Sequence, residues 1–375
     1  ILVIATATAS YWLQVEPEAW LSNTIAVLIV TCPCALALAT PVALAVSAGR
    51  FVETGVLPLR MRALDALAKS DIFVFDKTGT LTQGRPVLLD VDPMGGLDYS
   101  ECLQYASALS ADSEHPLAKA IHQQTPEPNI GAASRTNVPG SGVQAQIDGQ
   151  QWRLGQQTFA AQGHHIHADT MALIEDCRSS GQLVSLLSNP EGVQAVLTFD
   201  DPLRPGIIDM LSRLVRLGVK RLAVLSGDSR PSVSRLCQQL GIADCQGGMS
   251  PKDKLEWTQD LQREGHRIAM FGDGINDAPT LAAADVSLSF SEATDLANVS
   301  SDFIILGDSV DVLADARELA QRTRRNILQN FAWAGGYNLL AVPFAAAGYI
   351  PPWGAAIGMS LSSLIVVMNA LRLQS

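Results

Sequence analysis

Hydrophobic residues gather at the two ends of this 375-residue chain, whereas the middle alternates between short apolar and polar segments. Three long stretches carry no charged residue: residues 1–13, residues 19–49 and the 46 positions between Arg325 and Arg372. A membrane crossing takes about 20 predominantly apolar residues, so the last stretch is long enough for two. We therefore expect membrane helices at 1–15, 19–49, 326–350 and 353–372, the last pair joined by the Pro-Pro-Trp-Gly turn at 351–354.

The first stretch has neither an initiator methionine nor the basic start of a secretory signal. We interpret it as the end of a membrane helix that begins before residue 1, and the chain as a fragment. Basic residues flank the crossings on the side that faces the middle of the chain, which by the positive-inside rule places the middle in the cytoplasm. We expect an integral protein of the bacterial inner membrane, in contact with lipid. The basic residues are Arg50, Arg60, Arg62, Lys69, Arg322, Arg324, Arg325 and Arg372.

The middle of the chain has the pattern of an α/β domain. Apolar runs that lead into polar loops occur at 72–76, 221–228, 267–277 and 286–290, with helical stretches between them. Strands that alternate with helices indicate a parallel sheet. A segment rich in Gly, Gln and Ser interrupts the pattern and alternates as antiparallel strands do. We predict a doubly wound parallel sheet with an inserted α+β domain, divided as 50–84 (stalk and first portion of the sheet domain), 85–197 (insertion) and 198–320 (second portion).

Composition and charge limit the classes of molecule that this middle region is expected to bind. The chain is 47% hydrophobic with a net charge of −11, and the middle shows no basic stripe with interleaved aromatic residues. Nucleic acid is therefore not an expected partner. Four of the six cysteines are scattered at 102, 177, 237 and 245, which suits reduced cytosolic thiols rather than disulfides.

The other two cysteines flank a proline inside the second uncharged stretch, in the sequence TCPCALALATP. A disulfide between cysteines separated by one residue closes a strained ring. Proline in mid-helix frees backbone carbonyls, which membranes tolerate only where protein or a cavity satisfies them again. Cys32 and Cys34 therefore suggest a soft-metal site at bilayer depth, with Pro33 and Pro41 interrupting the helix. The alternative is a kinked apolar helix with two small buried cysteines.

Carboxylates follow the apolar runs of the middle region. They are Asp76 in DKTGTLT, Asp228 in SGD, and Asp273 with Asp277 in GDGIND. Open parallel sheets carry their chemistry at the carboxyl ends of the strands, so these side chains should converge. Each alone is typical of a turn or a helix cap, but their joint occurrence favours a catalytic site. A carboxylate there can attack a terminal phosphate if a cation offsets the charge of both partners.

DKTGTLT, GDGINDAP and the membrane CPC together resemble the motifs of heavy-metal-transporting P-type ATPases, and the resemblance covers essentially the whole chain. It implies a haloacid-dehalogenase-like fold in which ATP phosphorylates Asp76. Mg²⁺ would be held by Asp76, Asp273 and the carbonyl of Thr78. Lys254 resembles the family lysine that offsets phosphate charge. The other residues that the resemblance places at the phosphate site are Lys77, Thr80, Ser226, Gly227, Asp228, Asn276 and Asp277.

One position distinguishes a pump from a phosphatase. Soluble phosphatases resembling this fold usually carry a second Asp two residues after the nucleophile, where this chain has Thr78. Without that general base the aspartyl phosphate should persist, as coupling to transport requires. The insertion resembles the nucleotide-binding domain of the metal pumps, with Glu114, His115, Pro116, Gly140 and Gly142 as the expected ATP-binding residues. The histidines at 164, 165 and 167 lie in a polar connection and are interpreted as solvated surface.

The membrane residues bear on the choice of ion. Two thiolates suit Cu(I) or Zn(II), but the last two crossings contain no Asp, Glu, Lys or His, and a divalent ion in low dielectric is expected to need further charged groups. Tyr337, Asn338, Met359 and Ser363 resemble the copper(I) pump signature, whereas zinc pumps resemble one with a membrane Lys and Asp. The resemblance implies transport of Cu(I), with Ag(I) as its chemical relative, and delivery by a cytosolic copper chaperone.

The chain departs from the family pattern in two respects. The usual TGD loop reads Ser226-Gly227-Asp228, a variant that resembles copper pumps associated with oxidase assembly. No TGE loop occurs, so the actuator domain is expected before residue 1. Three alternatives stay open: a membrane-tethered phosphatase, a Zn(II)- or Cd(II)-transporting P-type ATPase, and a non-enzymatic copper-binding or sensor subunit.

Overall fold

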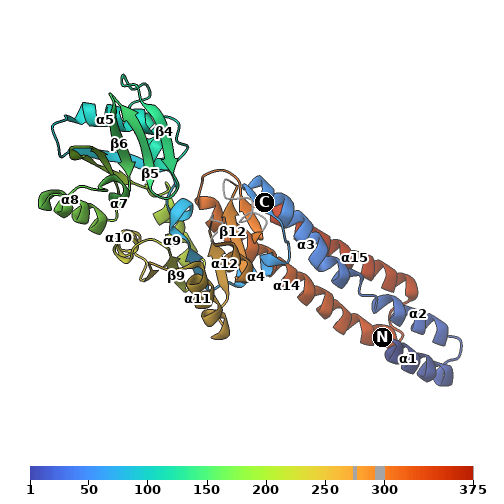
Figure 1. The fold of residues 1–375 in the computed structure, drawn as a ribbon. Coiled ribbons are helices and arrows are strands. Elements are labelled where there is room, and N and C mark those ends of the chain that lie inside the picture. The colour runs from blue at the N-terminus through green and yellow to red at the C-terminus, as the bar shows by residue number, and fades with distance from the viewer. Residues whose placement is uncertain (273–276, 292–299, 375) are drawn as a thin grey trace. The chain divides into compact units, whose positions relative to one another are not determined.

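The computed structural model in Figure 1 describes residues 1–272, 277–291 and 300–374. The chain divides into two compact units. We call the first the helical unit; it comprises residues 1–70, 302–307 and 311–375. We call the second the α/β unit; it comprises residues 71–301 and 308–310.

The helical unit takes its helices from both ends of the chain. They are α1 (Leu2–Val15), α2 (Trp20–Val30), α3 (Cys34–Glu53), α14 (Asp311–Ala346) and α15 (Pro352–Leu371). Shorter elements are α4 (Ala63–Lys69), the 3₁₀ turn η3 (Arg372–Gln374) and the antiparallel pair of β1 (Val56–Pro58) and β13 (Phe303–Ile305).

Two segments of the described chain are long and apolar enough to cross a membrane, Trp20–Glu53 and Pro352–Gln374. The segment expected to cross at 326–350 lies mostly in α14 and is not one of them. Its apolar sequence is interrupted by Gln329, Asn330 and Asn338.

Small residues form many of the contacts inside the helical unit, because they let helix backbones approach closely. Three packing layers join the helices from the two ends of the chain. The Val30 layer includes Val30, Ala341 and Ala355; the Ala35 layer includes Ala35, Ala334 and Val366; and the Ala43 layer includes Ala43 and Ala370, with Ile327 packed against them.

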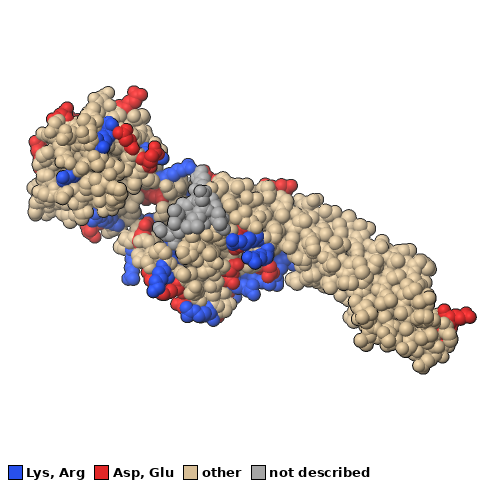
Figure 2. Space-filling model, turned by 45° about the vertical axis from the view of Figure 1, so that its right-hand side comes forward, with Lys and Arg blue, Asp and Glu red and all other residues tan. Residues whose placement is uncertain are grey.

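Large apolar side chains lie on the outside of the helical unit. Leu339, Leu340 and Trp353 are 76%, 67% and 69% exposed, and Figure 2 shows the visible face of the helices almost without charged residues. Extended apolar surface of this kind is unusual on a soluble protein. It suits helices that face lipid and supports an integral membrane protein.

The chain between α2 and α3 breaks at the Cys-Pro-Cys sequence. Pro33 precedes α3, and its carbonyl accepts the first helical hydrogen bond, from Ala37 N–H, at 2.8 Å. The break brings the Cα atoms of Cys32 and Cys34 to 5.5 Å, and their sulfur atoms are joined as a disulfide. The expectation of two free thiols here was wrong. The expectation of a second interruption at Pro41 was also wrong, since Pro41 lies inside the continuous helix α3.

Five strands of the α/β unit pair in parallel, in the order β12-β11-β2-β9-β10. The sheet core packs against Leu261 and Leu281 of two flanking helices. The parallel sheet is confirmed, and its fully buried central strands read as continuous apolar runs for that reason. The elements are β2 (Ile72–Phe75), β9 (Arg221–Leu225), β10 (Asp244–Gln246), β11 (Ile268–Phe271) and β12 (Val286–Phe290), with α9 (Ile207–Arg216), α10 (Arg230–Leu240), α11 (Pro251–Arg263) and α12 (Ala278–Ala283).

The predicted insertion is an antiparallel sheet in the order β3-β8-β7-β6-β5-β4. Neighbouring residues face opposite sides, as in any strand: Leu187 and Leu197 pack with α5 and α6, and Leu186 and Val196 pack with α7 and α8. The elements are β3 (Val87–Pro93), β4 (Ala133–Val138), β5 (Gly142–Ile147), β6 (Gln150–Gly155), β7 (Leu183–Asn189) and β8 (Gly192–Asp200), with α5 (Tyr99–Ser110), α6 (Pro116–Gln124), α7 (Gln157–Ala160) and α8 (Ala168–Ser179).

The cysteines of the α/β unit divide into two kinds. Cys102 and Cys177 are free and buried, as expected. Cys237 and Cys245 are joined as a disulfide, so the expectation of free thiols was wrong for this pair. The chain reverses at Gly241, which has a left-handed conformation, and this brings the two Cα atoms to 6.5 Å, within the range that a disulfide spans.

Candidate active site, nucleotide cavity and ion site

Asp76 follows β2 directly, and the backbone fixes its position. Its N–H donates to the carbonyl of Phe271 on the neighbouring strand β11 at 2.9 Å. The chain then turns through Lys77–Leu81, where Gly79 has a φ of +71°, a conformation that glycine adopts without strain. Asp76 is therefore held at the carboxyl edge of the parallel sheet, where such sheets carry their chemistry.

Lys254 of α11 joins two of the predicted carboxylates. Its Nζ lies 2.5 Å from Asp76 Oδ1 and 2.8 Å from Asp277 Oδ1, and all three residues are buried. Burial alone would lower the pKa of the Lys254 ammonium, but the two carboxylates outweigh burial and raise that pKa above its usual value. The ammonium therefore stays charged at neutral pH. It lies beside the Asp76 carboxylate, to which a phosphoryl group would be attached.

The Ser226-Gly227-Asp228 loop lies beside the loop that follows Asp76. Lys77 Nζ contacts Asp228 Oδ2 at 2.5 Å and Ser232 Oγ at 3.0 Å. Ser226 Oγ accepts from the N–H of Asp228 at 3.1 Å. The structure thus brings Lys77, Ser226 and Asp228 together, and a direct ion pair links the two loops.

Thr80 indicates what the site would hold. Its Oγ1 is buried and has no hydrogen-bond partner within the described residues, which costs about 1–3 kcal/mol for a buried polar group. A phosphoryl oxygen would satisfy it. Asp76 and the Thr78 carbonyl are hard oxygen donors of the kind Mg²⁺ prefers, so the described donors fit both groups. Asp273 and Asn276 lie outside the described residues.

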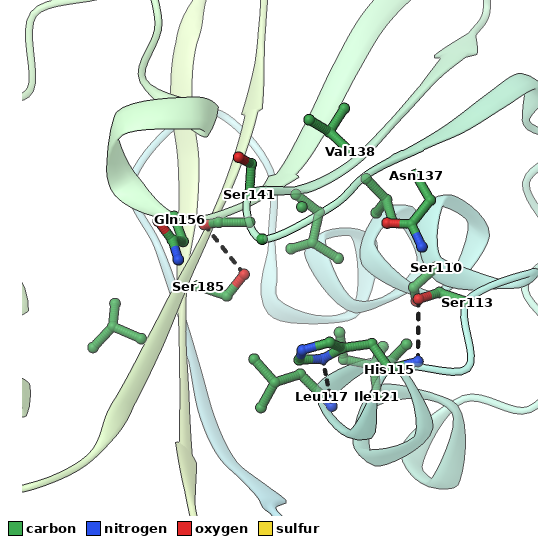
Figure 3. Close-up of a pocket in the computed structure, with 17 residues that line it drawn as sticks. Ser110, Ser113, His115, Leu117, Ile121, Asn137, Val138, Ser141, Gln156 and Ser185 are labelled. Atoms are coloured by element: carbon green, nitrogen blue, oxygen red, sulfur yellow. Dashed lines mark hydrogen bonds between the residues drawn. The ribbon is translucent and has the colours of Figure 1, made fainter. Parts of the chain in front are cut away.

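A cavity of about 230 Å³ lies in the inserted domain between the start of α6 and the β4–β5 and β6 region (Figure 3). His115 caps α6, and its Nδ1 accepts from the N–H of Leu117 at 3.2 Å. In the neutral imidazole the proton is then on Nε2, which is left to donate. Figure 3 shows Ser113 and Gln156 at opposite sides of this cavity, and Gly140 and Gly142 also line it. The cavity is apolar with a few polar groups, as ligand sites usually are.

Two of the residues expected in the nucleotide site do not line the cavity. Glu114 is exposed and its carboxylate pairs with Lys119 Nζ at 2.7 Å, while Pro116 occupies the first turn of α6. A residue that sequence reasoning missed does line it: Gly155 of β6. A Cβ built on Gly155 would lie 2.2 Å from the Ser141 carbonyl oxygen, so the close approach of β5 and β6 requires glycine there.

Along the sequence, the six residues expected to bind the transported ion fall between members of the Val30 layer and members of the Ala35 layer. One of them, Tyr337, packs against the Val30 layer itself. Tyr337 of α14 faces α15, because a Cβ built on Gly358, the neighbour of Met359, would lie 2.6 Å from its hydroxyl oxygen. In sequence order these residues are Cys32, Cys34, Tyr337, Asn338, Met359 and Ser363.

The segments that lie between these layers in the sequence, residues 31–34, 335–340 and 356–365, contain no charged residue. Among the described residues, no group of three or more His, Cys, Asp or Glu side chains is placed to hold a metal ion. The histidines at 164, 165 and 167, which are described residues, therefore do not form such a group either. An ion bound between the layers would be held by sulfur and neutral oxygen or nitrogen atoms.

Comparison with known proteins identifies the α/β unit. The family model for haloacid dehalogenase-like hydrolases matches residues 71–285. The chain belongs to this family. Within it, the chain is similar to the catalytic portion of heavy-metal P-type ATPases.

Relatives of the chain include the nitrogen fixation protein FixI of Rhizobium leguminosarum bv. viciae, 41% identical over 349 residues (93% of the chain, 44% of the relative). The copper-exporting P-type ATPase of Bacillus subtilis (strain 168) is 35% identical over 381 residues (100% and 47%). The chain spans about half the length of these curated relatives. Among solved structures, a zinc-transporting PIB-type ATPase in the E2.Pi state aligns with a TM-score of 0.85 at 30% identity, covering 100% of the chain and 62% of that protein.

Arg204 is a buried residue of the α/β unit that sequence reasoning missed. It donates to the carbonyl of Gly79 at 2.8 Å, and its guanidinium carbon lies 3.8 Å from the centre of the Phe290 ring. Arg204 therefore holds the turn that follows Asp76, through a hydrogen bond and a cation–π contact. No sequence signal links Arg204 to Phe290, because the contact exists only in the folded unit.

Asp201 is the second missed residue of the catalytic unit. Its Oδ2 accepts from Thr82 Oγ1 at 2.6 Å, while its Oδ1 is buried without a partner within the described residues. Burial raises the pKa of the Asp201 carboxyl, and the Thr82 hydrogen bond and the Lys77 charge only partly offset this. Asp201 is therefore costly to keep ionised.

Proposed function

We propose that the chain is the catalytic portion of an ATP-driven exporter of Cu(I), and of the chemically similar Ag(I), in the bacterial inner membrane. The observation that carries the ion assignment is the candidate ligand set, which offers two cysteines, a methionine and neutral oxygen and nitrogen atoms but no Asp, Glu, Lys or His. Two thiolates more than balance the charge of a monovalent ion, so it needs no further charged ligand, and a thioether and neutral oxygens complete a soft site. The name of the copper-exporting relative from Bacillus subtilis supports the same ion.

The proposed reaction begins with attack of an Asp76 carboxylate oxygen on the terminal phosphorus of ATP. The bond to the bridging oxygen breaks and ADP leaves, which gives an aspartyl phosphate. In this proposal Lys254, which pairs with Asp76, and the unpartnered Thr80 hydroxyl would interact with phosphoryl oxygens. Mg²⁺, held by Asp76, the Thr78 carbonyl and Asp273, would supply charge neutralisation. Water later releases inorganic phosphate and restores Asp76.

The cavity of the inserted domain is proposed to bind the adenine of ATP. The Nε2–H of His115 is available to donate to the base, and Gly140, Gly142 and Gly155 let backbone approach it closely. Glu114 remains a proposed member of this site, although its carboxylate pairs with Lys119 in this structure. Delivery of copper by a cytosolic chaperone belongs to the same proposal.

Zn(II) export is the second candidate, because the zinc-transporting ATPase aligns with the chain at a TM-score of 0.85. The two candidate ions differ in charge: Cu(I) and Ag(I) are monovalent, whereas Zn(II) is divalent. One experiment separates them: phosphorylation of the full-length parent by ATP in vesicles, with Cu(I), Ag(I) and Zn(II) compared. We expect Cu(I) and Ag(I) to stimulate phosphoenzyme formation and Zn(II) not to; stimulation by Zn(II) alone would reverse the assignment.

A further inference from the structure

A cavity of about 380 Å³ opens on the surface of the helical unit, beside α4 and α14. Its lining from α14 is spaced at three, one and three residues, which places these side chains on one face of the helix. We call it the Arg325 cavity. It is lined by Ala68 of α4 and by Gln321, Arg324, Arg325 and Leu328 of α14.

The charge of the Arg325 cavity is positive. Arg324 Nε lies 3.2 Å from Asp65 Oδ1, but Asp65 also pairs with Lys69, so one carboxylate faces two cations. Arg325 is exposed and pairs with no carboxylate within the described ranges 1–272, 277–291 and 300–374. Both arginines line the cavity, and the N–H donors of each guanidinium form a planar fork that suits a phosphate.

The cavity lies where charged sequence gives way to uncharged sequence. Arg325 is the last charged residue before Arg372. Ile327, two residues further along α14, packs against the Ala43 layer, which contains residues of both segments that are apolar enough to cross a membrane. Leu328 is 49% exposed on the cavity side. The site therefore has a cationic region at the membrane boundary and an apolar region one helical turn deeper.

We infer that the Arg325 cavity binds the phosphate of an anionic membrane phospholipid. Arg324 and Arg325 donate to the phosphate oxygens, and an acyl chain lies against Leu328 and Ala68. A free phosphate would use the arginines alone, whereas a lipid also covers the exposed Leu328 side chain. Basic pockets beside membrane helices on the cytoplasmic side are suited to lipid head groups. The inference rests on the membrane location of the helical unit and not on which ion is transported.

The test uses the full-length parent in nanodiscs of phosphatidylcholine with increasing phosphatidylglycerol, and counts bound phosphatidylglycerol by mass spectrometry after extraction of the protein. Arg325→Gln should weaken retention about tenfold, the loss of one charge-assisted contact. Arg322→Gln is the matched control, because it removes the same charge one helical turn away at a residue that does not line the cavity. Equal loss in both variants would overturn the proposal in favour of general surface charge.

A second arm separates a lipid from a free phosphate. Leu328→Asn should lower phosphatidylglycerol retention while leaving the arginines in place. A further sample is the protein in detergent, with a short-chain phosphatidylglycerol as the only lipid. Inorganic phosphate at millimolar concentration should not displace that lipid. Displacement by phosphate, or retention unchanged by Leu328→Asn, would show an anion site without lipid specificity and would contradict the inference. Phosphoenzyme formation from ATP, which none of these residues is proposed to carry, reports that each variant is folded.

Discussion

Lys254 Nζ lies 2.5 Å from Asp76 Oδ1, the proposed nucleophile, and both groups are buried. Asp76→Asn keeps the shape of this pair but replaces the carboxylate with a poorly nucleophilic amide. We expect it to abolish an acid-stable, hydroxylamine-sensitive phosphoenzyme made from ATP labelled at the γ-phosphate. Asp169→Asn, on the exposed first turn of α8, is the control and should label normally. Wild-type labelling of Asp76→Asn would show that another residue is the nucleophile.

Lys254→Met should unfold more easily than the wild type, because it leaves Asp76 and Asp277 as neighbouring buried carboxylates without a cation. Breaking a buried ion pair by removing one partner costs about 3–5 kcal/mol. Lys252→Met, on an exposed face of the same helix, removes only a surface pair with Glu256 and should cost less than about 1 kcal/mol. Urea unfolding measures both. Adding Asp277→Asn to Lys254→Met should recover some of the lost stability but not phosphorylation.

Lys254 should also make the free energy of unfolding depend on pH in alkaline solution. Its pKa in the folded protein lies above its usual value, so its contribution to the free energy of unfolding is fully present below the unfolded pKa of about 10.4. That contribution is lost only as the pH rises through the folded pKa. In the wild type, the stabilising contribution of Lys254 should therefore hold through neutral pH and decline only in alkaline solution, which urea unfolding at increasing pH measures.

The Asp76 site could be predicted from the sequence in part. An apolar run that ends in Asp76 predicts a buried strand and its loop, and the parallel sheet then brings the other loops to the same edge. Lys254 was predicted as a site residue only from the family resemblance, because a lysine in a polar helix has no local sequence signal that marks it as catalytic. Arg204 and Phe290 were missed since their contact joins segments 86 positions apart. Local rules were also wrong at Pro41, where the helix continues across the missing N–H.

Asp201→Asn should stabilise the protein at neutral pH. The amide oxygen can still accept from Thr82, while the cost of keeping a buried carboxylate charged disappears. Because the pKa of Asp201 is raised in the folded state, that cost is present above the folded pKa and vanishes as the pH falls below the usual value for Asp. The gain in thermal stability should therefore shrink in acid. A variant that is less stable than the wild type at pH 7 would mean that the charge of Asp201 is needed for the fold.

His115→Ala should weaken ATP binding and leave phosphorylation of the full-length parent by inorganic phosphate largely intact. The imidazole lines the cavity of the inserted domain and is not among the groups around Asp76. Losing one or two good contacts costs about 1–3 kcal/mol, roughly 5- to 150-fold in affinity. His165→Ala, on the exposed connection before α8, is the matched control. Equal loss of the ATP and phosphate reactions would place His115 outside the nucleotide site.

Cys32 and Cys34 are proposed to bind Cu(I) as thiolates after reduction of the bond that joins them in this structure. The break at Pro33 brings both sulfur atoms to one point, which residues two apart on an unbroken helix would not reach. Cys32→Ala or Cys34→Ala should abolish copper-stimulated phosphorylation from ATP in the full-length parent. Phosphorylation of Asp76 by inorganic phosphate, which needs no copper, should remain. Since thiolates form by loss of protons, copper affinity should fall as the pH drops.

Met359→Ala should weaken Cu(I) binding without creating a response to Zn(II), because it removes a soft neutral ligand and adds no charge. Met368→Ala is the matched control, since Met368 is on the same helix but 58% exposed and lies beyond the Ala35 layer. X-ray absorption on the reduced, reconstituted parent with one Cu(I) per chain reports the ligands directly. Sulfur scattering should dominate the first shell and fall on double replacement of Cys32 and Cys34. A shell of oxygen and nitrogen alone would rule out the CPC thiolates as the site, and with them the choice of a soft monovalent ion.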